Sequence, residues 1–253
     1  MRAGTTVSFV CNICDTACLA ACEALTREEP TCATCGSSVR TRAIVHLLST
    51  GLFGRSLALR DFPQDRAIHG VGLSDWAGYA GPLASRLGYT NTFFHQEPGL
   101  DIKDVPETMA GSADFVIAAD VFQHVLGPLQ RGFNGLRRLL RPGGLLVMTV
   151  PYDPAAATVE HFPGLAHADL REEAGRRRLY QRHDNGTVEV HEDLSFHGGP
   201  GFTLELRRFG LQDLIKHLER AGFERVQVRG EPVPERGITW APWSQPITAR
   251  IGA

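Results

Sequence analysis

The stretch that decides the fold is ADFVIAADVFQHV at residues 113–125, followed by LQRGFNGLRRLL at 129–140 and RPGGLLVMTVPY at 141–152. Its first seven residues form the apolar run that a strand buried on both faces of a parallel sheet requires. Residues 129–140 repeat apolar side chains at a helical period, and the proline and glycines that follow are typical of a helix end. The sequence therefore predicts a strand–helix–strand unit whose second strand spans residues 145–150.

Such a unit implies a right-handed crossover between two parallel strands. In open parallel sheets, ligands bind in the crevice beyond the carboxyl ends of the strands. Residues 120–124 follow the first of these strands, and Pro151 and Tyr152 follow the second. We therefore expect these two segments to border a ligand site.

Length and charge narrow the class of protein. A chain of 253 residues suits one large α/β domain with a small appendage. The net charge of −2 argues against a protein whose main work is binding nucleic acid. The N-terminal residues lack the apolar run of a secretory signal, and no run reaches membrane-spanning length. We therefore expect a cytoplasmic protein with no membrane partner, whose oligomeric state the sequence leaves open.

All six cysteines lie within residues 11–35. In a reducing compartment this clustering indicates metal or thiol chemistry rather than disulfides. Two Cys-x-x-Cys knuckles predict a tetrahedral Zn²⁺ site whose ligands are Cys11, Cys14, Cys32 and Cys35. Because four thiolates leave no open coordination position, the predicted role of the metal is structural.

The two remaining cysteines leave the ligand set open. Cys18 or Cys22 could replace a member of either pair, or both could be small buried residues. An iron–sulfur cluster is a further alternative, with the ligands Cys11, Cys14, Cys18 and Cys22.

A helix is predicted at residues 39–52, within a helical linker at 39–64 that follows a zinc-binding module at 1–38. Arg40 and Arg42 lie opposite its apolar face. We interpret that side as a solvated helix face. The alternative is that the two arginines contact an anionic group.

A glycine-rich turn, Gly70-Val-Gly72-Leu-Ser74, follows a short predicted strand. Glycine permits close approach of the backbone to a ligand, although a plain tight turn accounts for the motif equally well. A helix at residues 76–87 and a strand at 90–95 are predicted to follow.

The segment 151–201 is long and irregular, and within it Asn-Gly at 185–186 predicts a hairpin between residues 178–182 and 187–190. Because acidic residues balance its arginines, we interpret this hairpin as solvated rather than as a nucleic-acid contact. Regular structure resumes with a helix predicted at 210–221, then strands at 223–229 and 246–251.

Three segments, at residues 114–125, 141–151 and 207–223, together resemble successive motifs of the class I S-adenosylmethionine-dependent methyltransferases, in the branch called type 11. The resemblance implies an α/β fold with a Rossmann-like doubly wound sheet over residues 65–253. That sheet would be mostly parallel with an antiparallel last strand, and the insertion at 151–201 would form a substrate lid. The cofactor implied is S-adenosyl-L-methionine.

The resemblance also implies which residues contact the methionine part of the cofactor. Gly70, Gly72 and Ser74 would form the loop that packs against it. Asp120, after the fourth strand of the family pattern, would border the same moiety and the substrate. Ser74 stands where the family pattern has a third glycine.

For the nucleoside part, the resemblance implies that Glu97 holds the ribose hydroxyls and that Asp101 receives the adenine amino group. Two further departures from the family pattern concern this half of the pocket. Ile68 stands where an acidic residue normally precedes the glycines, and the chain from Gly70 to Asp114 is shorter than usual by about one strand–helix unit. Both predict a shortened, atypical cofactor pocket.

Methyl transfer from a sulfonium is an in-line displacement, in which the enzyme aligns the reactants and excludes water. Histidine suits the general base that a hydroxyl nucleophile needs. We expect the catalytic residues where the chain folds over the substrate, namely Tyr152, Glu160, His161 and His197. For His124 we expect packing at a helix end below the cofactor.

A metal-binding role for these histidines stays open. His161, His191 and His197 could form a second metal site with Glu160 or Asp193. Glycines on both sides of proline at 195–201 predict a constrained turn near a ligand.

The predicted function is therefore methylation of an oxygen or nitrogen of a small-molecule acceptor, such as a sugar or secondary metabolite. A second hypothesis is an RNA or protein methyltransferase that uses the zinc knuckle for recognition, with a basic face joining Arg40, Arg42 and the knuckle. A third hypothesis is aminopropyl-type transfer or cyclisation of the cofactor, and a fourth is a non-catalytic binding protein.

Overall fold

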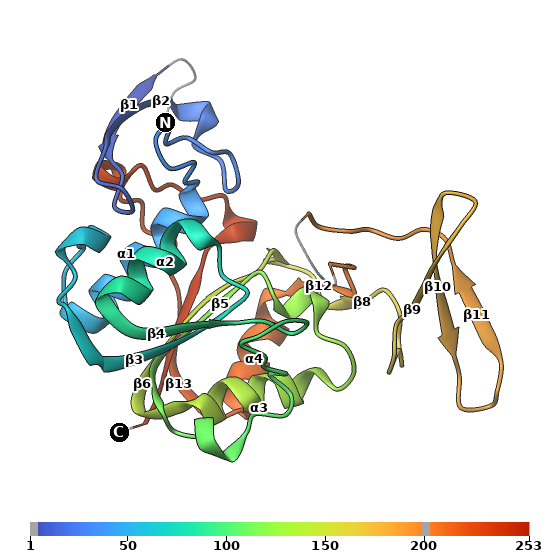
Figure 1. Ribbon diagram of the computed structural model, residues 1–253. Coiled ribbons are helices and arrows are strands. Elements are labelled where there is room, and N and C mark those ends of the chain that lie inside the picture. The colour runs from blue at the N-terminus through green and yellow to red at the C-terminus, as the bar shows by residue number, and fades with distance from the viewer. Residues whose placement is uncertain (1–4, 199–202, 253) are drawn as a thin grey trace.

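The computed structural model describes residues 5–198 and 203–252. Its centre is a six-stranded sheet in the order β13-β14-β6-β5-β3-β4 (Figure 1). The strands are β3 (Asp65–Leu73), β4 (Leu87–Thr92), β5 (Ala113–Ala119), β6 (Leu140–Thr149), β13 (Phe223–Val228) and β14 (Ile247–Ile251). Strands β4, β3, β5 and β6 run parallel, whereas β14 pairs antiparallel with β6. This confirms the predicted, mostly parallel sheet with an antiparallel last strand.

Helices cover both faces of the sheet. They are α1 (Val39–Phe53), α2 (Ala77–Arg86), α3 (Leu129–Leu139) and α4 (Leu211–Arg220). Along β5, Phe115 and Ile117 join the core beneath α1 and α2, whereas Val116 and Ala118 join the core beneath α3 and α4. Figure 1 shows the two pairs on opposite sides of the sheet. Because consecutive strand residues point to opposite faces, the continuous apolar run of β5 follows from burial on both.

The predicted strand–helix–strand unit is present as β5, α3 and β6, but two strand boundaries differ from those predicted. Strand β6 begins at Leu140, so residues 141–144 lie inside it rather than in a helix stop. A register shift against β5 between Ala113 and Phe115 accommodates them. Strand β4 begins at Leu87, directly after α2, because Leu87 is buried and pairs with β3.

The sheet is short on the β4 side, as the resemblance predicted. Strand β4 is the edge of the sheet, and the chain returns to β5 through turns and the short 3₁₀ helix η3 (Glu107–Met109). Gly135 of α3 comes so close to this return segment that a Cβ there would lie 1.7 Å from the carbonyl oxygen of Ile102. The return segment is therefore packed directly on α3.

A small N-terminal module precedes the sheet and lies above it in Figure 1. It consists of the antiparallel pair β1 (Thr6–Val10) and β2 (Ala17–Ala21), the 3₁₀ helix η1 (Cys22–Ala24) and the loop to Ser38. Phe9 and Leu25 pack with Val39 of α1 and with Ile238 from near the C-terminus. The module is thus packed against both α1 and the segment around Ile238.

The expectation of a solvated face on α1 is wrong. Arg42 is 0% exposed and donates to the backbone carbonyls of Ser37, Arg236 and Gly237. The same guanidinium lies 4.5 Å from the centre of the Phe9 ring. Because the N-terminal module covers this side of the helix, Arg42 serves the packing of the protein. It is not available for a basic face that would recognise RNA.

The described residues within 152–198 and 203–210 include the strands of two further small sheets. One holds β7 (Tyr152–Asp153), β8 (Val159–Glu160) and β12 (Arg207–Gly210), and the other β9 (Asp169–Glu173), β10 (Arg176–Arg182) and β11 (Val188–His191). The predicted hairpin is confirmed as β10 and β11, which pair from Arg182 and Val188 onward and extend away from the central sheet (Figure 1). Arg178 pairs with Glu173 and Glu192, which agrees with a charge-balanced hairpin.

Four short 3₁₀ helices complete the description: η2 (Leu59–Asp61), η4 (Phe122–His124), η5 (Pro234–Arg236) and η6 (Pro242–Ser244). Within the described ranges, no helix has the length and apolar character needed to cross a bilayer.

Candidate active site

A cavity of about 940 Å³ lies at the carboxyl ends of the parallel strands. Ser74 follows β3, Thr92 ends β4, Asp120 follows β5 and Pro151 lies just beyond β6, and all four line the cavity. This volume is at the upper end of the range of small-molecule and cofactor sites, and the position is the one expected for an open parallel sheet. Both predicted borders, after β5 and after β6, therefore meet at one site.

Of the predicted cofactor residues, Ser74, Asp101 and Asp120 line this cavity, whereas the two glycines lie inside β3. A Cβ on Gly70 would lie 2.0 Å from the Phe115 ring, and one on Gly72 would lie 1.9 Å from the Tyr89 hydroxyl oxygen. The glycines therefore let neighbouring side chains pack against the strand backbone. That Gly70 and Gly72 also contact a ligand remains a prediction.

Glu97 and Asp101 lie on the loop after β4. The carboxylate of Glu97 accepts a hydrogen bond from the amide of Gly99 at 2.9 Å, in an exposed turn beside the cavity. Asp101 lines the cavity and accepts from the amide of Lys103 at 2.9 Å. Two apolar residues, Phe93 and Leu100, line the cavity on the same loop. An aromatic and aliphatic wall with one carboxylate suits a flat heteroaromatic ring that carries an amino group.

The predicted catalytic residues are only partly brought together. His197 lines the cavity, whereas Tyr152 is buried in the main core and Glu160 pairs with the buried Arg207. His161 lies beside a second, smaller hollow of about 510 Å³. The turn predicted at 195–201 lies outside the described residues from position 199 on.

Glu205, which was not among the predicted site residues, links two of these histidines. Its carboxylate oxygens lie 2.9 Å from Nε2 of His161 and 2.6 Å from Nε2 of His197. Although burial acts to raise the pKa of Glu205, the hydrogen bonds from the two histidines hold it below its ordinary value. Its neighbours Leu204 and Leu206 are both buried. The alternation of apolar and polar residues in Thr-Leu-Glu-Leu-Arg at 203–207 is the sequence signal that Glu205 faces the side opposite to these leucines.

His124 lies at the end of η4 and also lines the cavity. Its Nδ1 lies 2.8 Å from the carbonyl oxygen of Leu204, so this nitrogen carries the proton and donates. Its ring centre is 5.3 Å from that of His197. Burial lowers the pKa of His124, which favours the neutral form with an acceptor at Nε2.

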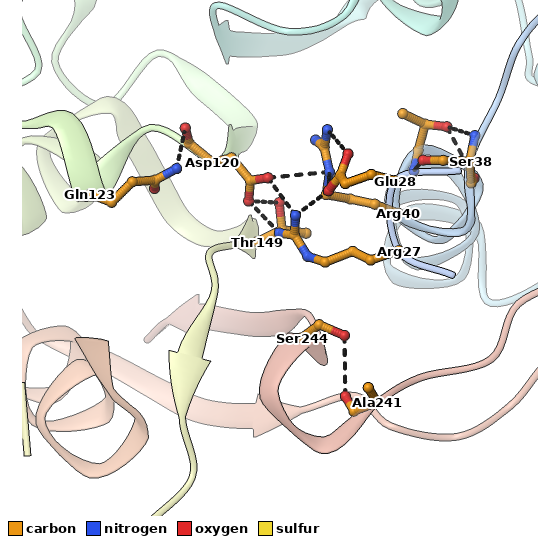
Figure 2. Close-up of polar contacts among 10 residues, drawn as sticks. Arg27, Glu28, Ser38, Arg40, Asp120, Gln123, Thr149, Ala241 and Ser244 are labelled. Carbon is orange, nitrogen blue, oxygen red and sulfur yellow. Dashed lines mark hydrogen bonds and ion pairs between the residues drawn. The ribbon is translucent and has the colours of Figure 1, made fainter. Parts of the chain in front are cut away.

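Asp120 is the most heavily engaged residue of the cavity (Figure 2). Arg27 of the N-terminal module donates to both of its carboxylate oxygens, and Nε of Arg40 lies 3.2 Å from Oδ2. The hydroxyl of Thr149 donates to Oδ1 at 3.0 Å. Burial alone would raise the pKa of Asp120, but the two arginines hold it at about 2. The residue has a backbone φ of 55°, a left-handed conformation that directs the chain from β5 into the cavity wall.

Asp75, next to Ser74, is a second carboxyl in the cavity wall. The Tyr89 hydroxyl donates to its Oδ2, and its amide donates to Oδ1 of Asn91 at 2.8 Å. Burial raises the pKa of Asp75 to about 7, although the hydrogen bond from Tyr89 acts in the opposite direction. Through these contacts with Tyr89 and Asn91, Asp75 holds the turn after β3 in place.

The four predicted metal ligands come together. The sulfur atoms of Cys11, Cys14, Cys32 and Cys35 all lie within 4.8 Å of one another. The Cys14 and Cys32 sulfurs are 3.5 Å apart, and those of Cys11 and Cys35 are 3.7 Å apart. A tetrahedron with metal–sulfur bonds of about 2.3 Å has edges of about 3.8 Å, so the donor set fits a tetrahedral thiolate-bound ion.

The iron–sulfur set and the second metal site find no support in the described part of the chain. Cys18 donates to the carbonyl of Thr16, and neither it nor Cys22 belongs to the four-sulfur group. Over residues 5–198 and 203–252, no second group of histidines and carboxylates gathers as metal ligands would.

Residues 90–148 match the model of a family described as a methyltransferase domain, which confirms the resemblance stated from the sequence. No curated protein matches the chain.

Among solved structures, the chain is similar to 1,6-didemethyltoxoflavin-N1-methyltransferase from Burkholderia thailandensis, at 14% identity over 74% of this chain and 72% of that one, with a TM-score of 0.44. It is also similar to CalS10, an amino pentose methyltransferase from Micromonospora echinaspora, at 15% identity over 85% of this chain and 92% of that one, with a TM-score of 0.46.

Proposed function

We propose that the protein is an S-adenosylmethionine-dependent methyltransferase that methylates an oxygen or nitrogen atom of a small molecule, such as a sugar or a secondary metabolite. The observation that carries the proposal is the cavity at the carboxyl ends of β3 to β6, which adjoins the region of the methyltransferase family match. A cavity of small-molecule size and a net charge of −2 favour a small acceptor over a nucleic acid.

In this proposal the nucleoside lies along the loop after β4. Phe93 and Leu100 pack on the adenine faces, and Asp101 accepts a hydrogen bond from the adenine amino group. Glu97, in the turn beside them, takes the ribose hydroxyls. The sulfonium then lies toward Ser74 and Asp120, at the ends of β3 and β5.

His197 is the proposed proton acceptor. With Nε2 hydrogen-bonded to Glu205, its Nδ1 is the basic nitrogen. The acceptor's lone pair forms the new bond to the methyl carbon as the carbon–sulfur bond breaks, and the sulfur keeps the electron pair as S-adenosylhomocysteine forms. The proton of a hydroxyl acceptor, or a proton of the methylammonium formed from a neutral amine, passes to His197. His161, on the other oxygen of Glu205, helps to fix that carboxylate, while Tyr152 and Glu160 shape the base of the lid.

Zn²⁺ is the ion proposed for the four cysteines, because a complete set of thiolates suits a structural zinc site. The metal would hold the two knuckles of the N-terminal module together and would take no part in methyl transfer.

The proposal is tested by incubating the purified protein with S-adenosylmethionine and a panel of hydroxylated and amino acceptors, with products identified by mass spectrometry. S-adenosylhomocysteine together with an acceptor that is heavier by one methyl group supports it. Methylthioadenosine would instead indicate attack on the aminobutyryl carbon. Absence of S-adenosylhomocysteine binding in calorimetry would refute the proposal.

A further inference from the structure

The wall of the cavity is not built by the central sheet alone. Arg27 and Glu28 come from the N-terminal module, Arg40 comes from the first turn of α1, and all three line the cavity next to Asp120. Figure 2 shows the guanidinium groups of Arg27 and Arg40 reaching that carboxylate, with Glu28 paired to the same two arginines. Ser74 lies on the wall of the same cavity. The N-terminal module thus reaches the end of the pocket where the methionine part of the cofactor is proposed to lie.

The charges of this cluster balance. Two guanidinium groups face two carboxylates, Glu28 and Asp120, and Glu28 accepts two hydrogen bonds of 2.8 Å from Arg40. A site for phosphate would carry an excess of positive charge. A cluster with equal numbers of both signs instead complements a zwitterion, and an α-amino-acid group is the zwitterion that the cofactor carries.

Each side of the cluster retains hydrogen-bonding capacity. The Arg27 side chain is 6% exposed, and its Nε is buried with no hydrogen-bond partner among the described residues. Arg40 uses Nε and Nη2 toward Glu28, and no partner within residues 5–198 or 203–252 engages its Nη1. Glu28 is 55% exposed, so its carboxylate can still accept from a ligand ammonium.

The glycine-rich strand does not supply the same contacts. Ile68 occupies the position where the family pattern has an acidic residue, and its side chain joins the apolar core beneath α1 and α2. The nearest carboxyl on that side, Asp75, has both oxygens buried and turned toward Tyr89 and the protein interior. A zwitterionic group at this end of the cavity therefore has the N-terminal module and Asp120 as its charged partners.

We propose that Arg40 and Glu28 of the N-terminal segment, supported by Arg27 and Asp120, bind the amino-acid end of S-adenosylmethionine. Nη1 of Arg40 donates to the α-carboxylate of the cofactor. The α-ammonium donates to the carboxylates of Glu28 and Asp120. The inference rests on the proposed function, since it assigns residues to one end of that cofactor.

The experiment compares two ligands by calorimetry on the full-length protein with its metal bound. S-adenosylhomocysteine carries the amino-acid group, and methylthioadenosine lacks it but shares the nucleoside and the sulfur. Each of Arg40→Gln and Glu28→Gln is expected to weaken S-adenosylhomocysteine binding about 10- to 100-fold, the range of one charge-assisted contact. Binding of methylthioadenosine is expected to stay within about twofold of the wild type in both variants.

Arg60→Gln is the matched control. Arg60 is a surface arginine, 66% exposed, that pairs with Asp15 of the same N-terminal module. Its loss should change neither affinity, and metal content and circular dichroism check that each variant is folded. Glu28, being half exposed, allows the test even where Arg40→Gln perturbs the module.

Three outcomes would overturn the inference. One is unchanged S-adenosylhomocysteine affinity in both variants. Another is an equal loss of affinity for both ligands, which would indicate general damage to the pocket. The third is a wild-type protein that binds methylthioadenosine as tightly as S-adenosylhomocysteine. A wild type that binds neither ligand refutes the proposed function itself, and this inference with it.

Discussion

The guanidinium of Arg27 donates to both carboxylate oxygens of Asp120, although 93 positions separate the two residues in the chain. This contact joins the N-terminal module to the carboxyl end of β5. It makes one wall of the cavity depend on both parts of the protein.

Replacing Asp120 by Asn should destabilise the protein by about 3 kcal/mol, because it leaves the buried guanidinium of Arg27 with only the half-exposed carboxylate of Glu28 as a counter-charge. Urea denaturation at neutral pH measures the effect. Asp15→Asn is the control, since Asp15 also has a left-handed backbone but pairs with the exposed Arg60. Its loss should cost less than about 1 kcal/mol. Equal costs for the two variants would contradict the importance given to the Arg27 contact.

The same ion pair predicts a dependence of stability on acid. The pKa of Asp120 is about 2 in the folded protein, below its ordinary value of 3.8. A carboxyl whose folded pKa is lowered contributes stability that is present above its unfolded pKa and is lost as the pH falls through the folded one. The stability difference between wild type and Asp120→Asn should therefore shrink from pH 4 to pH 2. A difference that stays constant over this interval would count against the pair.

Removing the metal should weaken cofactor binding from a distance. Loss of a structural metal unfolds the segment that its ligands hold, so chelation or Cys32→Ser should release Arg27 and Glu28 from the cavity wall. We expect weaker binding of S-adenosylhomocysteine and nearly unchanged binding of methylthioadenosine. Elemental analysis of the untreated protein should give about one zinc per chain, the stoichiometry of a four-thiolate site. If a metal-free protein bound both ligands normally, the module would have no part in the pocket.

Glu205→Gln should lower kcat by about 10- to 100-fold, because a neutral amide no longer stabilises the protonated form of His197. KM for S-adenosylmethionine should change little, since Glu205 does not line the cofactor cavity. A loss of kcat at nearly constant KM is a split that a purely structural role would not produce. Glu189→Gln is the control, because Glu189 bonds His183 in the exposed hairpin at 3.1 Å.

Two glycine substitutions compare a closely packed glycine, in β3, with one that has open space around it, in α2. Gly72→Ala would place a Cβ 2.3 Å from Oδ2 of Asp75 as well as against Tyr89, and should destabilise the protein by about 1–3 kcal/mol. Gly81→Ala, in α2, meets no atom within 4 Å and should stabilise it by up to about 1 kcal/mol. Thermal denaturation of both variants measures the contrast.

The sequence predicted the parts of the fold that are governed by local patterns. Strand β5 matches its predicted bounds, because a short apolar run flanked by polar residues is typical of a strand that is buried on both faces of a parallel sheet. The grouping of the four cysteines was equally predictable, since the spacing within each knuckle brings its two sulfurs together. The start of β6 was missed because strand pairing with β5 overrides the turn preference of proline and glycine at 142–144.

The remaining parts of the site depend on contacts that no local pattern carries. Arg27 sits in a polar loop, and nothing around it indicates a partner beyond β5. Arg42 was expected in solvent because the helix pattern alone does not show that a second layer covers that face. Glu205 was missed for a related reason, since its two histidine partners, His161 and His197, are far apart in the chain.

Arg42 also makes the N-terminal module depend on a segment near the other end of the sequence. Its guanidinium is satisfied by carbonyls of Arg236 and Gly237, 194 and 195 positions away, and the core of the N-terminal module includes Ile238. A gene fragment that encodes only the cysteine knuckles would therefore specify a module with part of its core missing and a buried charge unsolvated. The N-terminal module therefore completes its core only together with the segment around residue 237.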